Sequence, residues 1–486
     1  MPSRLRHAIF VAALLLLNGC ATRPINAPIA EADNAAGYRY MTREHYFKDK
    51  EDLVILAFSG GGTRAAAFSY GVLETLRDTG VIDAKGNKLR LLDYVDMITG
   101  VSGGSFTALA YGLYGDRLFD DYEQRFLKRN VEGELLARLF SPLYWGPLSS
   151  TGWGRSELAA QLYDEILFNK ATYADLQKGS GALIVVSATD LSTGGRFYFL
   201  QSMFDALCSD VASVPLSRAA ASSSAVPVVL SPVTINNYGG TCRYSEPPLL
   251  KLITDPDHPA RPAARAIQRW KELQSYGSGA QRPYVHLVDG GVSDNVGMRG
   301  VLEALDDLEA LHLLHQKTPL DRVRRIIVYV VNSLSSPETT WGTSENAPGS
   351  FAVLLRATGV PIDHYSYEAV ELMKDTAAHW AGLRAIRDSG ALTNNGNPAL
   401  VEVTTVPNAE IYVIDVSFPA LKDKAERDYL NNLPTSFVLP AEAVDRLRAA
   451  AKKIILESPE FQRLLNDMGE RIVKPPVNAP SSSGAS

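Results

Sequence analysis

Short apolar runs alternate with longer amphipathic segments along most of this 486-residue chain. The run at 53–58 leads into three glycines, which is typical of a buried strand, and 64–79 carries apolar side chains at helical spacing. Further strands are predicted at 91–98, 182–188, 196–200, 228–235, 284–288, 326–331 and 411–416. Helices interleave with most of them. The pattern therefore predicts an α/β fold with a mostly parallel central sheet and helices on both faces.

Two stretches interrupt this alternation. Residues 243–283 are rich in Pro, Arg and Gly around one amphipathic piece at 260–273, and are predicted to be an insertion. Residues 333–410 mix loop-forming residues with a helical segment near 365–386, which predicts a lid, a pocket wall or a small subdomain. Helices are predicted again at 440–456 and 459–468.

These features divide the chain into five parts. The predicted parts are a signal peptide at 1–19, a tether at 20–50, a main domain at 51–332, a part that packs on or extends it at 333–470, and a disordered Pro/Ser-rich tail at 471–486. We see no internal repeat.

The first residues are predicted to be an export signal, because a basic start precedes an apolar run at 8–17 that is too short to span a membrane. Residues 17–20, Leu-Asn-Gly-Cys, resemble the cleavage box of bacterial lipoproteins. That resemblance implies that Cys20 becomes the first mature residue and carries lipid on its sulfur. Ala21 follows where an aspartate would imply retention in the inner membrane. We therefore expect an outer-membrane lipoprotein that faces the periplasm or the cell exterior; a conventionally cleaved or uncleaved signal peptide is the alternative.

Composition adds two points. The formal net charge is −6 and no basic run with interleaved aromatics occurs, so we expect no nucleic-acid partner. Besides Cys20, the cysteines are Cys208 and Cys242, an even pair that permits a disulfide in an exported protein. The sequence leaves this pairing open, and it predicts no oligomeric state.

A candidate nucleophile stands in Gly-Val-Ser-Gly-Gly, residues 100–104. Ser102 follows an apolar run and precedes a helix-like stretch, which is the setting of a nucleophile elbow. Gly100 and Gly104 permit the sharp turn and the close approach of a substrate carbonyl. Because a serine is weakly nucleophilic by itself, Ser102 needs a base within hydrogen-bond reach. The alternative is a glycine-rich turn with an incidental serine.

A second glycine-rich loop lies upstream. Gly60, Gly61 and Gly62 follow a predicted strand and open a predicted helix, so their N–H groups can converge on an anion. In acyl transfer this anion is the tetrahedral oxyanion. A phosphate loop is disfavoured, because no Gly-Lys-Ser/Thr follows and the spacing is not G-x-G-x-x-G. Arg64 is expected to orient the loop, to meet a lipid phosphate, or simply to form a salt bridge.

An acidic loop lies downstream, where Asp289 follows the strand at 284–288 and precedes two glycines. If the strands are parallel, this carboxylate reaches the same sheet edge as Ser102. The alternative is an aspartate that stabilises a turn. Asp294 and Asn295 are expected to be turn or capping residues.

The order Gly-Gly-Gly-x-Arg, Gly-x-Ser-x-Gly and Asp-Gly-Gly, with an Ala/Ser-rich helix and proline at 216–227, resembles the patatin-like phospholipase family over about 52–300. The resemblance implies a three-layer sandwich and a dyad in which Ser102 is the nucleophile and Asp289 the proton acceptor. It also implies an oxyanion hole at 60–62 and Arg64, and hydrolysis of a membrane phospholipid or other lipid ester through an acyl-enzyme, without metal or cofactor. The insertion and the uncovered C-terminal third depart from the pattern and leave the substrate open.

Two alternatives remain. An α/β-hydrolase triad requires a histidine after the acid in the chain, and His364, which follows Asp363, is the best-placed candidate. His286 is expected on the opposite sheet face from Asp289. A non-catalytic lipoprotein that binds lipid or a partner is the second alternative, and the complete motifs weigh against it.

Overall fold

The computed structural model describes residues 21–40, 42, 50–82, 86–150, 152–179, 181–245, 264–313, 317–336, 341–390, 400–469 and 471–473. Cys20, the predicted signal peptide, the middle of the predicted insertion and nearly all of the predicted tail lie outside these residues. Within them, no helix combines the length and the apolar character needed to cross a membrane.

The main sheet has eight strands in the described residues: β1 (Asp52–Phe58), β4 (Val95–Val101), β5 (Leu183–Asp190), β6 (Arg196–Tyr198), β7 (Val233–Asn236), β8 (Tyr284–Val288), β9 (Arg325–Asn332) and β10 (Glu410–Ser417). Their order is β10-β9-β1-β4-β5-β8-β7, with β6 on β5. The strands from β10 to β5 are parallel, and β6, β7 and β8 add an antiparallel edge. The predicted mostly parallel α/β sheet is confirmed.

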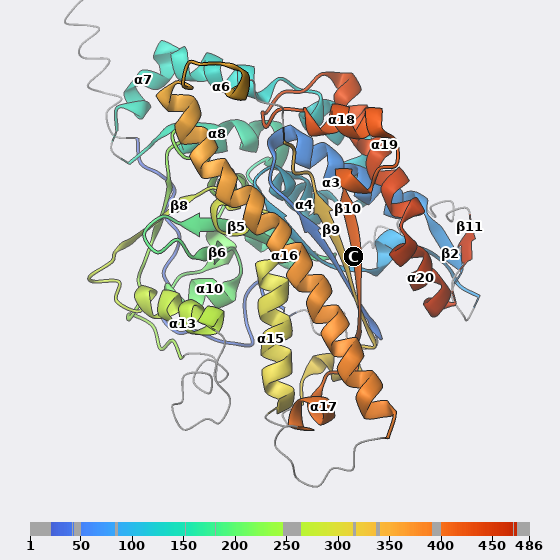
Figure 1. Cartoon of the computed structure of the whole chain (residues 1–486). Helices are drawn as coiled ribbons and strands as arrows, with labels where there is room; N and C mark the ends of the chain where they lie inside the picture. Colours follow the sequence, from blue (N-terminus) through green and yellow to red (C-terminus); the bar gives the residue numbers. More distant parts are fainter. Residues whose placement is uncertain are drawn as a thin grey trace, which may run out of the picture.

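Helices cover both faces of this sheet (Figure 1). Alternate side chains of β1 show the division, since Leu56 packs into one apolar core and Ile55 into the other. The larger core includes side chains of α3 (Gly62–Asp78), α4 (Gly103–Tyr114), α8 (Arg155–Tyr163), α11 (Leu216–Ser223), α19 (Ala441–Glu457) and α20 (Pro459–Met468). The smaller core includes side chains of α15 (Arg299–Leu313) and α16 (Ser350–Asp388).

The remaining elements are short. They are α5 (Leu118–Tyr122), α6 (Val131–Phe140), α7 (Pro142–Leu148), α9 (Tyr173–Lys178), α10 (Gln201–Ala206), α13 (Ala264–Tyr276), α14 (Gly291–Asp294), α17 (Val401–Thr405) and α18 (Lys424–Asn431), with a small sheet of β2 (Gly80–Ile82), β3 (Lys88–Arg90) and β11 (Arg471–Val473). Two predicted strands begin later than expected: residues 91–94 form a 3₁₀ turn before β4, and β7 begins at Val233.

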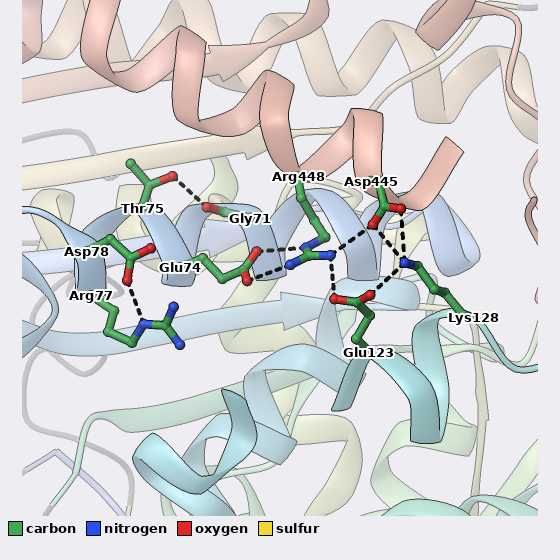
Figure 2. Close-up of polar contacts among 9 residues, drawn as sticks. All are labelled: Gly71, Glu74, Thr75, Arg77, Asp78, Glu123, Lys128, Asp445 and Arg448. Carbon is green, nitrogen blue, oxygen red and sulfur yellow. Dashed lines mark hydrogen bonds and ion pairs between the residues drawn. The ribbon is translucent and has the colours of Figure 1, made fainter. Parts of the chain in front are cut away.

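The C-terminal part belongs to the same layers as the main domain. Strand β10 pairs with β9 along its whole length, and α19 packs on α3. Figure 2 shows the ion pairs of Arg448 on α19, which are formed with Glu74 on α3 at 2.7 Å, with Asp445 of its own helix at 2.9 Å and with Glu123, which follows α5. Gly71 allows the close approach, because a Cβ there would lie 2.6 Å from the Arg448 Cα. Residues 333–470 therefore complete the sheet and its helical layer.

Residues 21–40, which belong to the predicted tether, lie against the domain. The Asn26 side chain donates to Ser209 Oγ at 2.7 Å, and Tyr38 is 1% exposed. Arg39 forms a buried ion pair with Asp205 at 2.8 Å. Although the segment is polar and irregular in sequence, several of its polar side chains have partners within the fold.

Candidate active site

Ser102 is held in a strained turn between β4 and α4. Its backbone has φ 46° and ψ −120°, a conformation that residues with a side chain rarely adopt. The Ser102 N–H donates to Ser223 Oγ at 2.8 Å, and Ser223 Oγ donates to the Ser187 carbonyl at 2.6 Å. Because Ser223 lies on α11 and Ser187 on β5, two separate elements fix the elbow. Strain at such a site is retained where the surrounding structure enforces it.

The flanking glycines admit the neighbouring backbone, as the motif predicts. A Cβ at Gly104 would lie 2.6 Å from the Ser59 carbonyl oxygen, and one at Gly100 would lie 2.8 Å from the Ser105 Cα. Gly103 is packed even more closely, since a Cβ there would lie 2.0 Å from the Gly62 carbonyl oxygen. The elbow and the glycine loop therefore touch backbone to backbone.

Asp289 lies within hydrogen-bond distance of the serine. Ser102 Oγ donates to Asp289 Oδ2 at 2.9 Å, and the Gly291 N–H donates to Asp289 Oδ1 at 2.8 Å. The aspartate is 7% exposed, and this burial raises the pKa of its carboxyl to about 6 although both hydrogen bonds lower it. The carboxyl is therefore ionised above that pH and can accept the serine proton.

The strand that leads to Asp289 runs in the opposite direction to that expected. Strand β8 is antiparallel to β5 and pairs only with its last residues, Thr189 with Val288 and Asp190 with Leu287. Strand β5 extends past the end of β4, whose Val101 pairs with Ser187. Strand β8 therefore runs back along this protruding end and stops beside Ser102. Asp289 therefore lies beside Ser102, as expected, but at the end of an antiparallel strand and not of a parallel one.

The glycine loop faces the same cavity as the dyad. The Gly60 N–H donates to the Asn295 carbonyl at 2.9 Å, so it is not free for a substrate. Gly61 has φ 137° and Gly62 φ 61°, and within the part of the chain that the structure describes their N–H groups have no hydrogen-bond acceptor. Gly61 and Gly62 are thus the better donors to a bound anion than Gly60.

Arg64 connects the glycine loop to the C-terminal half of the chain. Its guanidinium donates to the carbonyls of Ser333 at 2.7 Å and Leu433 at 2.8 Å, and to Thr435 Oγ1 at 3.1 Å. Burial lowers the pKa of this side chain to about 10. These contacts favour the loop-orienting role among those predicted for Arg64.

A cavity of about 560 Å³ opens over the dyad and the glycine loop. Most of its apolar lining comes from three places, with Leu135, Leu136 and Leu139 on α6, Leu158 on α8, and Val226, Pro227, Val229 and Leu230 after α11. Arg155, Arg356 and Asp363 add charged groups. An apolar cavity beside a serine and a carboxylate accommodates a hydrocarbon chain next to the reacting centre.

Two residues of the site were not assigned a role from the sequence. Ser223 lies in the predicted Ala/Ser-rich helix, and its hydroxyl holds the elbow. Asn295, expected to be a turn residue, packs between the glycine loop and the loop that carries Asp289. A Cβ at Gly60 would lie 2.5 Å from the Asn295 Oδ1, and a Cβ at Gly291 would lie 2.9 Å from it. Asp294 is a cap as expected, accepting from the N–H groups of Met298 and Arg299 at 3.0 Å each.

The alternative histidines lie elsewhere. His364 is on α16, and the partner of its neighbour Asp363 is Arg356 at 3.2 Å. His286 contacts Thr234 Oγ1 at 3.0 Å. None of the described histidines contacts Ser102. The described residues also contain no group of three His, Cys, Asp or Glu suited to a metal ion.

The two remaining cysteines do pair. Cys208 and Cys242 form a disulfide with their Cα atoms 5.4 Å apart. It closes the loop from α10 to the start of the predicted insertion and lies outside the cavity lining.

The close packing of Gly103 allows a specific prediction. We expect Gly103→Ala to lower the free energy of unfolding by about 1–3 kcal/mol, because the new Cβ must push the glycine loop away from the elbow. The matched control is Gly382→Ala on α16, where a Cβ meets nothing within 4 Å and is expected to be neutral or slightly stabilising. Urea unfolding of both variants measures the difference. A Gly103→Ala protein as stable as the wild type would contradict this packing.

Burial of Asp289 predicts a pH-dependent stability difference. Because its pKa is about 6 in the folded chain and ordinarily 3.8, the carboxyl favours folding below about pH 4, and this contribution is lost as the pH rises through about 6. The full difference corresponds to about 3 kcal/mol. Asp289→Asn removes this titration, so its Tm relative to that of the wild type is expected to increase by a few degrees from pH 4 to pH 7. Thermal melts in which the difference is independent of pH would contradict it.

An α/β sheet that presents a serine elbow against a buried aspartate is the arrangement typical of serine hydrolases. A family model described as Patatin-like phospholipase matches residues 56–302, a little over half of the sequence. The chain belongs to the patatin-like phospholipase family.

No curated protein sequence matches the chain significantly. Among solved structures, similarity is found to human GIVD cytosolic phospholipase A2 in complex with methyl gamma-linolenyl fluorophosphonate, at 13% identity and TM-score 0.39, over 86% of this chain and 59% of that one. VipD from Legionella pneumophila is similar at 11% identity and TM-score 0.29, over 94% of this chain and 74% of that one. This chain thus spans about three fifths of the human chain. With TM-scores below 0.5, these similarities say nothing about the site.

Proposed function

We propose that this protein hydrolyses lipid esters by a Ser102–Asp289 dyad through an acyl-enzyme intermediate. The observation that carries the proposal is the 2.9 Å hydrogen bond from Ser102 Oγ to Asp289 Oδ2 on the floor of an apolar cavity. The family of the chain supports the same reaction class.

In the first half of the proposed reaction, Ser102 Oγ transfers its proton to Asp289 Oδ2 and attacks the ester carbonyl carbon. The carbonyl oxygen becomes an oxyanion, to which Gly61 and Gly62 donate their free N–H groups. Each such donor is typically worth about 2.7–4 kcal/mol of barrier. The ester C–O bond then breaks, the alcohol leaves with the proton from Asp289, and the acyl group stays on Ser102 Oγ.

In the second half, water replaces the alcohol. Asp289 takes a proton from the water, whose oxygen attacks the acyl carbon. The bond to Ser102 Oγ breaks, the proton returns to that oxygen, and the fatty acid leaves. Asp289 is suited to both steps, because a base whose pKa lies near 6 is ionised at neutral pH yet releases its proton readily.

The proposed setting is a membrane surface. The predicted lipidation of Cys20 would anchor the chain in the outer membrane, facing the periplasm or the cell exterior, and would hold the cavity near the phospholipid of that membrane. The proposed reaction uses residues of the chain and water, and no cofactor.

The proposal is tested by product analysis. The full chain is incubated with a mixed lipid extract, and the products are identified by mass spectrometry. We expect free fatty acid and the matching deacylated lipid in equal amounts. An extract whose acyl groups are unchanged would contradict a lipid ester hydrolase, and fatty acid that appears on a second lipid would indicate acyl transfer in place of hydrolysis.

A further inference from the structure

Helices α6 and α7 expose large apolar side chains to solvent. The exposed fractions are 82% for Leu143, 73% for Phe140, 54% for Trp145 and 48% for Leu136. We call these four residues the α6–α7 surface. Single exposed apolar residues are ordinary, but a cluster over two consecutive short helices marks an interaction site. Helix α7 adds no charge, since its sequence is Pro-Leu-Tyr-Trp-Gly-Pro-Leu.

The charges of α6 are directed to other parts of the fold. The Glu132 carboxylate accepts from the Phe437 N–H at 3.1 Å, and Glu134 pairs with Arg129 at 2.6 Å. Arg138 pairs with Glu165. Two of the three charged side chains of α6 are therefore ion-paired, and the four residues of the α6–α7 surface are themselves uncharged.

This surface is continuous with the cavity above the dyad. Leu136 belongs to both, and Leu135 and Leu139 line the cavity from the same helix. Helix α16, from which Arg356 and Ile362 line the cavity, also has exposed apolar side chains in its first turns, where Val353 is 46% and Leu354 47% exposed. Figure 1 shows α6, α7 and the beginning of α16 at the same end of the molecule. Two helices that line the cavity, α6 and α16, thus also carry exposed apolar side chains.

The chain also enters the fold beside α7. Ser150, two residues after that helix, donates its Oγ proton to the Ala21 carbonyl at 2.7 Å. Because Cys20 directly precedes Ala21 in the chain, a lipid on Cys20 would attach the protein to a membrane next to the α6–α7 surface.

We propose that the α6–α7 surface docks onto the lipid bilayer in which the N-terminus is anchored. Its side chains enter the interfacial layer, where tryptophan is favoured, and direct the cavity entrance toward the membrane. A phospholipid then moves from the bilayer to Ser102 along apolar side chains, without crossing water. This inference rests on the proposed lipid ester hydrolysis. A bilayer is preferred to a protein partner because the anchoring point, the apolar surface and the cavity entrance share one side.

The test compares three forms of the full chain: wild type, the surface variant Phe140→Gln/Leu143→Gln/Trp145→Gln, and the control variant Leu191→Gln/Ile386→Gln/Ile472→Gln. The exposed fractions of the control residues are 57% for Leu191, 44% for Ile386 and 48% for Ile472. None of the three lines the cavity. Each form is assayed on a soluble short-chain ester and on vesicles of phosphatidylethanolamine and phosphatidylglycerol. We expect the surface variant to lose at least about tenfold on vesicles and less than about twofold on the soluble ester. The control is expected to match the wild type on both.

A second readout does not depend on activity. Vesicles that carry a spin-labelled lipid should quench the fluorescence of Trp145 and so lower the total tryptophan emission. The Trp145→Leu variant keeps an apolar side chain at this position, and its emission should not show this decrease. Unquenched Trp145, or a surface variant as active on vesicles as the wild type, would overturn the docking proposal. A dimer in vesicle-free buffer that the surface variant abolishes would overturn it in favour of a second copy. If no form cleaves either ester while Trp145 is quenched, docking stands and the proposed hydrolysis fails.

Discussion

Ser102→Ala is expected to lower kcat for ester hydrolysis about 10⁶-fold and to abolish covalent labelling by a fluorophosphonate. The reason is that the acyl-enzyme cannot form without the Ser102 hydroxyl, and removal of the nucleophile in serine hydrolases has a loss of about this size. Residual turnover would come from binding and from the Gly61 and Gly62 N–H groups. Steady-state hydrolysis of a chromogenic ester measures the loss.

The matched control is Ser69→Ala on α3, a buried serine whose Oγ has no hydrogen-bond partner in the described residues. It is expected to keep wild-type activity and labelling. If Ser102→Ala retained substantial activity, the nucleophile would lie elsewhere and the elbow would be only a turn. If both variants were inactive, the loss would reflect folding, which circular dichroism would show.

Asp289→Asn carries the second largest expected effect, a fall in kcat of about 10⁴-fold. An amide keeps the shape of the carboxyl and its contact with the Gly291 N–H, but it cannot take the proton from Ser102 Oγ. Substituting an acid by an amide in a serine triad costs about this factor, although that acid acts only through a histidine. A direct base should be at least as important.

Asp294→Asn on α14 is the control for this change. Asp294 is also buried, but its two oxygens cap α15, and its loss should reduce stability while leaving kcat largely unchanged. Near-full activity of Asp289→Asn would exclude the dyad. If His364→Ala were then inactive, a histidine triad would be established in its place.

Much of the fold was predictable because the elements that carry the site have strong local signals. The spacing of apolar residues predicts strand β1 and helix α3, and the glycine triplet between them indicates the loop. The Ser102 elbow is predictable for the same reason. The sequence indicates Asp289 as a candidate because it follows the end of a predicted strand. This signal is the same whether the neighbouring strand is parallel or antiparallel.

What the sequence could not predict depends on partners distant in the chain. The antiparallel direction of β8 follows from its pairing with the end of β5, which no local pattern encodes. Arg64 finds its acceptors at Ser333 and Leu433, in a part of the chain that the motifs do not cover. The packing of residues 21–40 likewise requires buried partners such as Asp205. Long-range contacts of this kind decide the role of a residue whose type alone permits several.

The central claim, that Asp289 activates Ser102 directly, is tested best by the pH dependence of fluorophosphonate labelling, with the labelled peptide identified by mass spectrometry. We predict that the label is on Ser102, that its rate rises with pH through about 6 as Asp289 ionises, and that Asp289→Asn is slow at every pH. Labelling of another residue, or an equal rate in wild type and Asp289→Asn, would contradict the account.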